Sequence, residues 1–404
     1  MSTSLLYHAF GIRGYDYVNT RYEEGRVVFT IRQRRHTYRC SLCGTRDVFP
    51  HGHQERQFKA VPIGGKPVAI VLPIPRVECP RCGVRRQVPL NFADPRRSYT
   101  RTFERYALEL SRHMTIQDVA EHLQVSWDTI KDIQKRYLWK RFRKPRLGKL
   151  KQVAIDEVAI GKGHRYLTVV LNLENGAVVF VGDGKGADAL EPFWKRLKAA
   201  RAQVDAVATD MSAAYIQAVR EHLGDAVHVF DHFHVIKLFN EKLSDFRREL
   251  YHEATDRMHK EVLKGTRWLL LKNPENLDPR RGERERLEEA LRMNQPLATV
   301  YYLKEDLRQI WEQSDKETAA RVLDDWIRRA EASCIKVLQK FAGTLAMYRT
   351  GILAYYDGRI STGPLEGTNN KIKTMQRQAY GFRDKEFFKL KILALHEAKY
   401  ALVG

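Results

Sequence analysis

The sequence predicts a multidomain α/β protein: a small cysteine-bearing module, a short helical domain, and a strand-and-helix core interrupted by an all-helical insertion. Three observations predict this order. Two cysteine pairs occur near the N-terminus, short helical patterns follow them, and from about residue 150 apolar strand patterns alternate with helical ones. The expected domains cover residues 1–98, 99–145, 150–236, 237–357 and 358–404, and the last range is expected to return to the core.

Charge is concentrated in the first third of the chain. The 404 residues carry a formal net charge of +21, of which residues 1–150 hold +16 and the remainder +5. Such a basic region favours a nucleic-acid partner, although the same charge could contact anionic lipid or serve solubility. No run of 18 apolar residues and no secretion signal occur, so we expect no membrane association, a cytoplasmic location and reduced cysteines.

Four of the five cysteines form two pairs, Cys40 with Cys43 in "YRCSLCGTRD" and Cys79 with Cys82 in "VECPRCGVRR". Each pair is a Cys-x-x-Cys followed by glycine, a turn in which two thiolates grip one ion. Two such turns predict a tetrahedral Zn²⁺ site in a zinc-ribbon-like module. The alternative is a redox dithiol or unrelated surface cysteines. The intervening "FKAVPIGGKPVAIVLPI" predicts a hairpin around Gly64-Gly65.

Three short helices are predicted between residues 99 and 145, because apolar residues recur there at helical spacing. Thr115 and Ser126 are suited to N-capping the second and third helices. The short "LQVS" break between these two helices predicts a helix-turn-helix, whose last helix would enter a major groove. The alternative is a three-helix packing unit without DNA contact. The outer side of the last helix would carry Thr129, Lys131, Asp132 and Lys135, and we expect Thr129, Lys131 and Lys135 to contact DNA.

From Val153 the period of the apolar pattern changes from helix to strand. The segments "KQVAIDEVAIG", "RYLTVVLNLENGAVVFVGDG" and "VDAVATD" predict strands, and the full order reads β-β-β-α-β-α-β-α. Three meandering strands followed by alternation are the start of a ribonuclease-H-like fold. Residues 237–357 lose the strand pattern and predict the helical insertion, in which Cys334 is expected to be a small buried side chain.

Two acids belong to apolar strand patterns. Asp156 falls inside the first strand, and Asp210 ends "VDAVATD", which we expect to run parallel beside it. Two carboxylates about 4 Å apart repel by roughly 4 kcal/mol at an effective dielectric constant near 20, so the pair should hold a proton or a hard divalent ion. Oxygen ligands favour Mg²⁺ or Mn²⁺. Two such ions would activate a water or a 3′ hydroxyl against a phosphodiester, and they require a third acid.

Glu366 is the candidate for that third acid. It lies in "GPLEGTNNKIK", which predicts a loop entering a helix. The basic and amide residues that follow, Asn370, Lys371, Lys373 and Arg377, are expected to hold DNA phosphates. The alternative is that Glu366 only balances the dipole at a helix N-terminus.

Other polar residues compete for a place in the site. Glu157 follows Asp156 but should point to the opposite face of the strand. Asp231, His232 and His234 in "VFDHFHVIK" could form a metal cluster, a proton relay or a strand-end network. Asp231 and His234 are therefore secondary site candidates.

Taken in order, the cysteine pairs, the helix-turn-helix and four later segments resemble the DDE transposases of the ISL3 insertion-sequence family. Those segments are "AIDEVAIGKGHRYLTVVLNL", "ATDMSAAYIQAV", "VFDHFHVIKLFN" and "GPLEGTNNKIKTMQRQAYGFRDKEFFKLKIL". The resemblance covers nearly the whole chain. It implies a ribonuclease-H-like core with an inserted helical domain, a metal-binding triad of Asp156, Asp210 and Glu366, and cut-and-paste movement of an element bounded by inverted repeats. One departure is "STGPLEG", which has Thr362 where Asn is expected; the acid remains.

The resulting hypothesis is a transposase that acts in the cytoplasm in association with the nucleoid. The zinc module and helix-turn-helix would bind the ends of the element, and the core would cleave DNA and join the 3′ hydroxyl to a target. Holding two ends together predicts a homodimer or a larger assembly on DNA. The alternatives are a catalytically inactive DNA-binding regulator, a structure-selective DNA nuclease and an RNA-binding enzyme.

Overall fold

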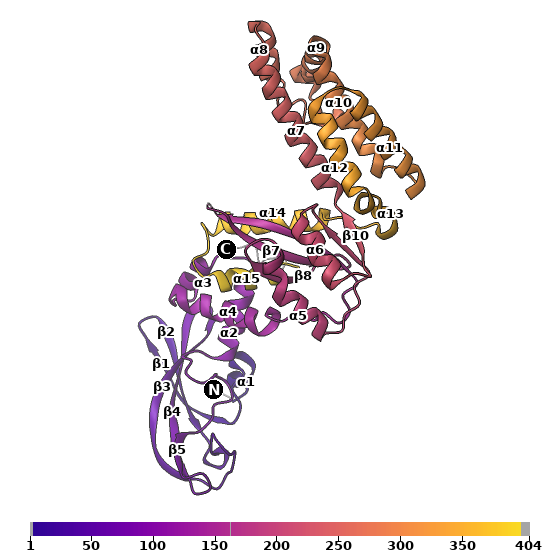
Figure 1. The fold of residues 1–404 in the computed structure, drawn as a ribbon. Helices are drawn as coiled ribbons and strands as arrows, with labels where there is room; N and C mark the ends of the chain where they lie inside the picture. The colour runs from indigo at the N-terminus through magenta and orange to yellow at the C-terminus, as the bar shows by residue number, and fades with distance from the viewer. Residues whose placement is uncertain (1–2, 162, 397–404) are drawn as a thin grey trace. The chain divides into compact units, whose positions relative to one another are not determined.

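The computed structural model describes residues 3–161 and 163–396, and the chain divides into two compact units. The first unit is formed by Met1–Arg143 together with Met375–Gly404, and the second by Lys144–Thr374. The division falls within one helix, α14 (Gly363–Gln378). Each unit is described by itself below (Figure 1).

The first unit opens with helix α1 (Thr3–Phe10) and a five-stranded sheet. Its strands run in the order β1-β2-β4-β3, with β5 paired to β4. They are β1 (Tyr15–Glu23), β2 (Arg26–Gln33), β3 (Phe49–Ile63), β4 (Lys66–Cys79) and β5 (Val84–Gln87). The β3–β4 hairpin turns at Gly64 and Gly65, both at positive φ, which confirms the predicted hairpin. The β1–β2 hairpin was not predicted.

Three helices follow this sheet: α2 (Arg101–Leu110), α3 (Ile116–His122) and α4 (Trp127–Phe142). Both predicted N-caps are confirmed, because the Thr115 side chain accepts from the Asp118 N–H and the Ser126 side chain from the Thr129 N–H. Thr115 and Asp118 also form a reciprocal capping box.

Helix α15 (Lys385–Leu393) packs against α4 in the first unit. The sequence had assigned all of 358–404 to the catalytic core, whereas the structure groups the described residues from Met375 onward with the helix-turn-helix. The physical reason is burial: Phe387, Phe388 and Leu390 of α15 lie in the interior of this unit.

The second unit contains a five-stranded sheet in the order β10-β9-β6-β7-β8. Strands β6, β7 and β8 are antiparallel neighbours, and β6, β9 and β10 run parallel. The elements are β6 (Gln152–Gly161), β7 (Arg165–Asn172), β8 (Val178–Asp183), α5 (Glu191–Ala199), β9 (Ala206–Thr209), α6 (Ala213–His222) and β10 (Val227–Phe230). Their succession follows the predicted β-β-β-α-β-α-β, and α5 and α6 bury apolar residues against the sheet (Figure 1).

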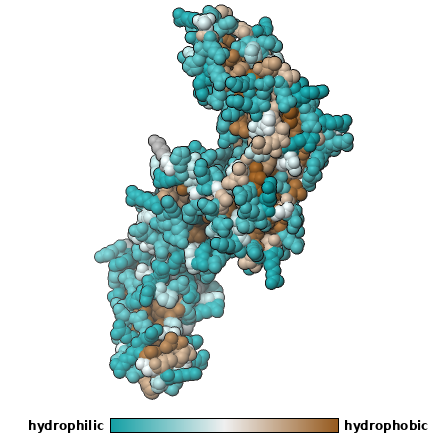
Figure 2. Space-filling model, viewed as in Figure 1, coloured by the Kyte–Doolittle hydropathy of each residue, from teal (hydrophilic) through white to brown (hydrophobic). Residues whose placement is uncertain are grey.

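A helical block leaves this sheet at the end of β10, and α7 carries the chain into it (Figure 1). Its helices are α7 (His232–Glu253), α8 (Arg257–Gly265), α9 (Glu283–Met293), α10 (Gln295–Arg308), α11 (Lys316–Ala332), α12 (Lys336–Leu353) and α13 (Tyr355–Gly358). Trp326 is fully buried at the centre, where its indole N–H donates to the Leu303 carbonyl at 2.7 Å. Figure 2 shows apolar patches on the visible face of this block, whose exposed side chains include Trp268 and Met347.

Two expectations for this region were wrong. Cys334 is exposed rather than buried, because it lies between α11 and α12 in the left-handed region at φ 58°. Helix α14 already begins at Gly363, so Glu366 lies in its first turn and not in a loop before it.

Helix α12 approaches β10 so closely that only glycine fits at Gly351. A Cβ there would lie 2.3 Å from the Phe230 ring, whereas a Cβ at Gly343 of the same helix would meet nothing within 4 Å. We expect Gly351→Ala to lower the free energy of unfolding by about 1–3 kcal/mol through overpacking. Gly343→Ala should raise it by up to about 1 kcal/mol. Thermal unfolding midpoints of the two variants test this, and shifts of the same sign would contradict the close packing.

Candidate functional site

Three acids lie at matching positions on neighbouring parallel strands, with Asp156 inside β6 and Asp210 and Asp231 directly after β9 and β10. Ala154 of β6 pairs with Ala208 of β9, which places Asp156 and Asp210 the same distance beyond the paired residues. Phe230, the last residue of β10, pairs with Thr209, so Asp231 follows in the same row as Asp210. The edge of the sheet therefore gathers three carboxylates, as the sequence predicted for the first two.

Asp156 has a polar neighbour at each carboxylate oxygen. The Asn369 amide nitrogen donates to Oδ2 at 2.8 Å, and the His234 Nε2 lies 3.8 Å from Oδ1. Burial raises the pKa of Asp156 above its usual value, and the negative charge of Asp210 adds to this, although the Glu157 N–H and His234 oppose it. A nearby cation would stabilise the ionised form of a carboxylate in this environment.

Asp231 and His234 connect this strand edge to the start of α14. The His234 Nδ1 lies 3.3 Å from Asp231 Oδ2, and the Thr362 N–H donates to Asp231 Oδ1 at 3.0 Å. Burial alone would lower the pKa of His234, but the hydrogen bond to Asp231 and the charge of Asp156 raise it. Burial opposes ionisation of Asp231, yet the bonds from His234 and Thr362 hold its pKa below the usual value. The two residues thus link the strand edge to the start of α14.

Asp210 and Glu366 are less constrained than Asp156. Asp210 is half-buried, and its Oδ1 accepts from the Ser212 N–H at 2.9 Å. Glu366 is half-buried, and its N–H donates to the Thr362 carbonyl at 2.9 Å. In the part of the chain that the structure describes, the four cysteines are the only metal-ligand group of three or more with all donor atoms within 4.8 Å of one another. Asp156, Asp210 and Glu366 therefore do not form such a ligand group among the described residues.

The Glu157 side chain lies on the opposite face of the sheet from Asp156, as its adjacent position in the strand predicted. Its Oε1 accepts from the Gly186 N–H at 3.0 Å and from the Tyr215 hydroxyl at 2.8 Å. With these partners Glu157 ties β6 to α6 and to the loop after β8.

The residues around Asp156 fit a hard divalent cation. Asn369 is 5% exposed, and its Oδ1 is buried without a hydrogen-bond partner. A carbonyl oxygen without a hydrogen-bond partner, on a residue bonded to a half-buried carboxylate, offers the oxygen donors that Mg²⁺ and Mn²⁺ prefer. Asn369 was missed by the sequence analysis, which chose Asn370 from the same stretch. The three-residue spacing between Glu366 and Asn369, which puts both on one helix face, is the signal that was available.

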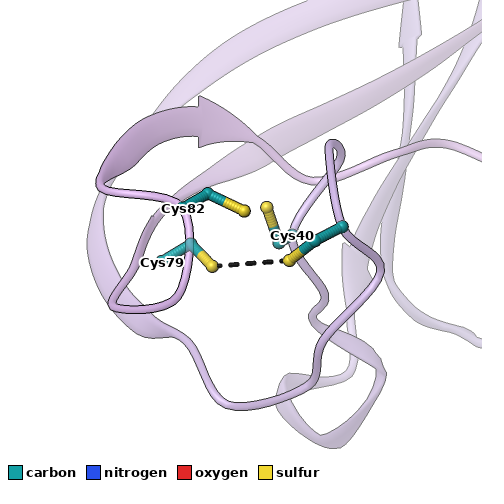
Figure 3. A group of neighbouring side chains, drawn as sticks. Cys40, Cys79 and Cys82 are labelled. Atoms are coloured by element: carbon teal, nitrogen blue, oxygen red, sulfur yellow. Dashed lines mark hydrogen bonds between the residues drawn. The ribbon is translucent and has the colours of Figure 1, made fainter.

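The four cysteines of the two pairs converge in the first unit. Their sulfurs all lie within 4.8 Å of one another, and Figure 3 shows the labelled Cys40, Cys79 and Cys82 turned toward a common centre. The Cys43 and Cys79 sulfurs are 3.6 Å apart. Two thiolates on one tetrahedral Zn²⁺, each bonded at about 2.3 Å, would be about 3.8 Å apart. The cluster therefore fits zinc, and the alternative of unrelated surface cysteines is excluded.

Both cysteine turns have the geometry that the glycines predicted. The Gly44 N–H donates to the Cys40 carbonyl at 3.0 Å and the Gly83 N–H to the Cys79 carbonyl at 2.9 Å, with both glycines at positive φ. Backbone N–H groups of Cys43 and Leu42 lower the pKa of Cys40 to about 6. The Cys40 turn thus favours the thiolate form that metal binding needs, whereas burial raises the pKa of Cys79, and the neighbouring Cys43 thiol together with burial raises that of Cys82 to about 12.

The residues predicted to face DNA from α4 are not on an open surface. Lys131 and Lys135 are half-buried, and their ammonium groups lie 3.3 Å and 3.0 Å from the Asp384 carboxylate. Lys135 also lies 3.0 Å from Glu386. Thr129 is half-buried as well. The expectation of an exposed outer side was wrong, because α15 packs there.

The residues predicted to hold phosphates on α14 are all exposed: Asn370, Lys371, Lys373 and Arg377. Their side chains are therefore accessible to a polyanion.

Three family models match the chain in the order of the domains. The first model, described as a zinc-finger of transposase IS204/IS1001/IS1096/IS1165, matches residues 36–85. The second, described as a helix-turn-helix domain of transposase family ISL3, matches residues 88–138. The third is the ISL3 model of the DDE type, described as a transposase, and it matches residues 153–392. The zinc-finger match and the converging thiols together indicate Zn²⁺, and the helix-turn-helix implies DNA binding.

Two curated relatives cover most of the chain. The transposase for insertion sequence element IS1001 of Bordetella parapertussis is 35% identical over 358 residues, 88% of this chain and 88% of that protein. The transposase for IS1557 of Mycobacterium tuberculosis (strain CDC 1551 / Oshkosh) is 29% identical over 388 residues, 89% of this chain and 86% of that protein. By class the protein is a transposase, an enzyme that acts on DNA. Within that class the chain belongs to the ISL3 family of DDE transposases.

Proposed function

We propose that this transposase binds the terminal inverted repeats of an insertion sequence and catalyses metal-dependent strand cleavage and 3′-hydroxyl strand transfer. Asp156, Asp210 and Glu366 are the proposed catalytic acids. The observation that carries the proposal is the hydrogen bond from Asn369 to Asp156, because it ties the helix of the third acid to the strand of the first. The ISL3 family match over residues 153–392 adds to this support.

The proposed core is ribonuclease-H-like, with residues 237–357 as its helical insertion. Three antiparallel strands followed by two parallel ones support this assignment, as does the separate apolar core of the helical block. In that arrangement Asp156 and Asp210 lie on adjacent strands while Glu366 returns on α14, after the insertion. The proposed domain ranges 1–98 and 99–145 are supported by the zinc-finger and helix-turn-helix matches.

The chemistry proposed for the site needs two divalent cations, Mg²⁺ or Mn²⁺, which would polarise the scissile phosphate and lower the pKa of the attacking hydroxyl. The chain's own part is to place carboxylates on both sides of the phosphate. Asp156 is fixed by Asn369 and lies beside His234, whereas Glu366 can adjust its side chain in the first turn of α14. The exposed Lys371 and Lys373 on the same helix would contact the DNA backbone.

End recognition is assigned to the first unit, through the zinc module and the helix-turn-helix. We expect a dimer or larger assembly, because both ends of the element must be held together before joining. The described residues contain no helix long and apolar enough to cross a membrane.

The proposal is tested by incubating the zinc-loaded protein with DNA carrying two element ends and a supercoiled target plasmid. Cleavage and joined products should appear in Mg²⁺ or Mn²⁺ and should be absent when the zinc-loaded protein is assayed without either cation. End binding without any cleavage would indicate a regulator, and cleavage without transfer of 3′ ends a nuclease. Preference for RNA in a competition at fixed salt would contradict DNA as the substrate.

A further inference from the structure

We propose that Asn369 is a further oxygen donor of the catalytic metal site and also the residue that orients Asp156. This inference rests on the proposed function, since it requires a cation at Asp156. A carboxylate only accepts hydrogen bonds, so the amide nitrogen of Asn369 must be the atom that faces Asp156. Its oxygen does not take part in this hydrogen bond, and it is buried with no partner.

Burial makes an unpaired oxygen at Asn369 costly unless something compensates it. The residue is 5% exposed, and it follows Glu366 by three residues on α14, so the two side chains share a helix face. A cation held by Asp156 would satisfy this oxygen without adding charge to a site already rich in carboxylates. The same amide would keep the Asp156 carboxylate in one orientation before the cation arrives.

The test measures Mn²⁺ binding to the zinc-loaded full chain by electron paramagnetic resonance, independently of activity. Asn369→Ala should weaken Mn²⁺ affinity roughly 10-fold or more, the effect typical of lost metal-site partners. Asn369→Asp retains an oxygen and should restore the affinity, although it no longer donates to Asp156. Gln378→Ala, an exposed change on the same helix, is the control.

Each outcome separates this inference from the proposed function. If Asn369→Ala and Asn369→Asp both bind Mn²⁺ like the wild type, Asn369 has a structural role and the inference is overturned. If the wild-type protein itself binds no Mn²⁺, or if Asp156→Asn does not weaken its binding, the metal site of the proposed function fails. Circular dichroism at the assay temperature establishes that each variant is folded.

A second, independent observation concerns the acidic pair of α15, Asp384 and Glu386. We infer that this pair competes with DNA phosphates for Lys131 and Lys135 of α4, and so restrains end binding. This inference also rests on the proposed function, in which α4 contacts DNA. The carboxylates take the positions that phosphate oxygens would take on a basic helix face.

The two acids differ in how accessible they are. The side chain of Glu386 is 65% exposed, whereas that of Asp384 is 24% exposed, and apolar residues of α15 are buried. Asp384 also caps α15, because its Oδ1 accepts from the Phe387 N–H at 3.0 Å. For phosphates to replace the pair, both acidic side chains would have to leave the lysines, Glu386 first and the less accessible Asp384 after it.

Charge-neutral variants test this competition. Asp384→Asn keeps the helix cap, because Asn caps as well as Asp, and Glu386→Gln keeps the side-chain shape. The double variant should bind a duplex carrying one element end roughly 10-fold more tightly at low salt. It should also steepen the salt dependence by about 1.8 in log–log slope, because two more phosphates are neutralised. Glu386→Gln alone should give well under half that change in slope, because Asp384 still pairs with both lysines.

The matched control removes the same charge elsewhere in the unit, with Asp16→Asn and Glu23→Gln on β1, whose carboxylates pair with Arg34 and Arg21. Equal tightening in this control would mean that net charge explains the effect, and it would overturn the competition. Unchanged affinity and slope in the α15 variants would overturn it as well. If Lys131→Ala with Lys135→Ala costs no affinity in the α15 double variant, the DNA-binding role proposed for α4 fails instead.

Discussion

Asp156→Asn is expected to reduce strand cleavage by about 10³-fold or more while leaving binding to element ends unchanged. The substitution removes the carboxylate charge that the proposed cation requires. Metal ions lower the activation free energy of such reactions by several kcal/mol, and about 1.4 kcal/mol corresponds to a tenfold change in rate. Asn has the same shape, and its amide oxygen can still accept from Asn369. Cleavage of labelled element ends in Mg²⁺ and Mn²⁺ and an electrophoretic binding assay measure the two quantities separately.

The matched control is Glu157→Gln, a substitution of the neighbouring acid on the same strand. Glu157 binds Gly186 and Tyr215 on the other side of the sheet, so its loss should act on stability and not selectively on cleavage. Retained cleavage by Asp156→Asn would show that the metal assignment is wrong. Equal loss of end binding and cleavage would show that Asp156 supports the fold instead.

Cys79→Ser is expected to abolish zinc retention and to unfold the cysteine-bearing end of the first unit. Cys79 is fully buried at the end of β4, and its sulfur lies 3.6 Å from that of Cys43. Structural zinc supplies roughly 10–16 kcal/mol to small zinc domains, far more than the few residues around these turns can gain from packing. Zinc content after dialysis, protease sensitivity of residues 36–85 and affinity for element ends should all report the loss.

Cys334→Ser is the matched control, because Cys334 is exposed between two helices of the other unit. It should retain one zinc per chain and bind element ends like the wild type. Chelation of the wild-type protein should reproduce the Cys79→Ser result, and added Zn²⁺ should reverse it. A Cys79→Ser protein that keeps its zinc would contradict the four-cysteine site.

Local patterns in the sequence were sufficient for the elements that depend on near neighbours. The hairpin at Gly64-Gly65, the N-caps Thr115 and Ser126, and the parallel pairing of β6 with β9 were all predicted and are all present. The two cysteine pairs also converge, since each turn fixes two ligands by itself and the hairpin brings the turns together. The β1–β2 hairpin was not predicted, because β1 has few apolar residues and only its first position is buried.

Side-chain directions in the site needed the three-dimensional structure. Asn370 was predicted because it follows Glu366 by four residues and so shares its helix face. The contact of Asn369 with Asp156 instead joins residues 213 positions apart. Likewise, Lys135 was expected to face outward because nothing near it in the sequence covers it. It is covered by Asp384, 249 positions away.

By itself, the sequence determined the order of the domains, the two cysteine pairs that converge and the strands that carry Asp156 and Asp210, because periodicity, turn residues and cysteine spacing are local properties. Only the tertiary structure decided that Asn369 holds Asp156 and that acidic residues of α15 occupy the basic face of α4. Those contacts depend on how distant segments pack, and the packing free energy is shared among many residues that no short pattern records.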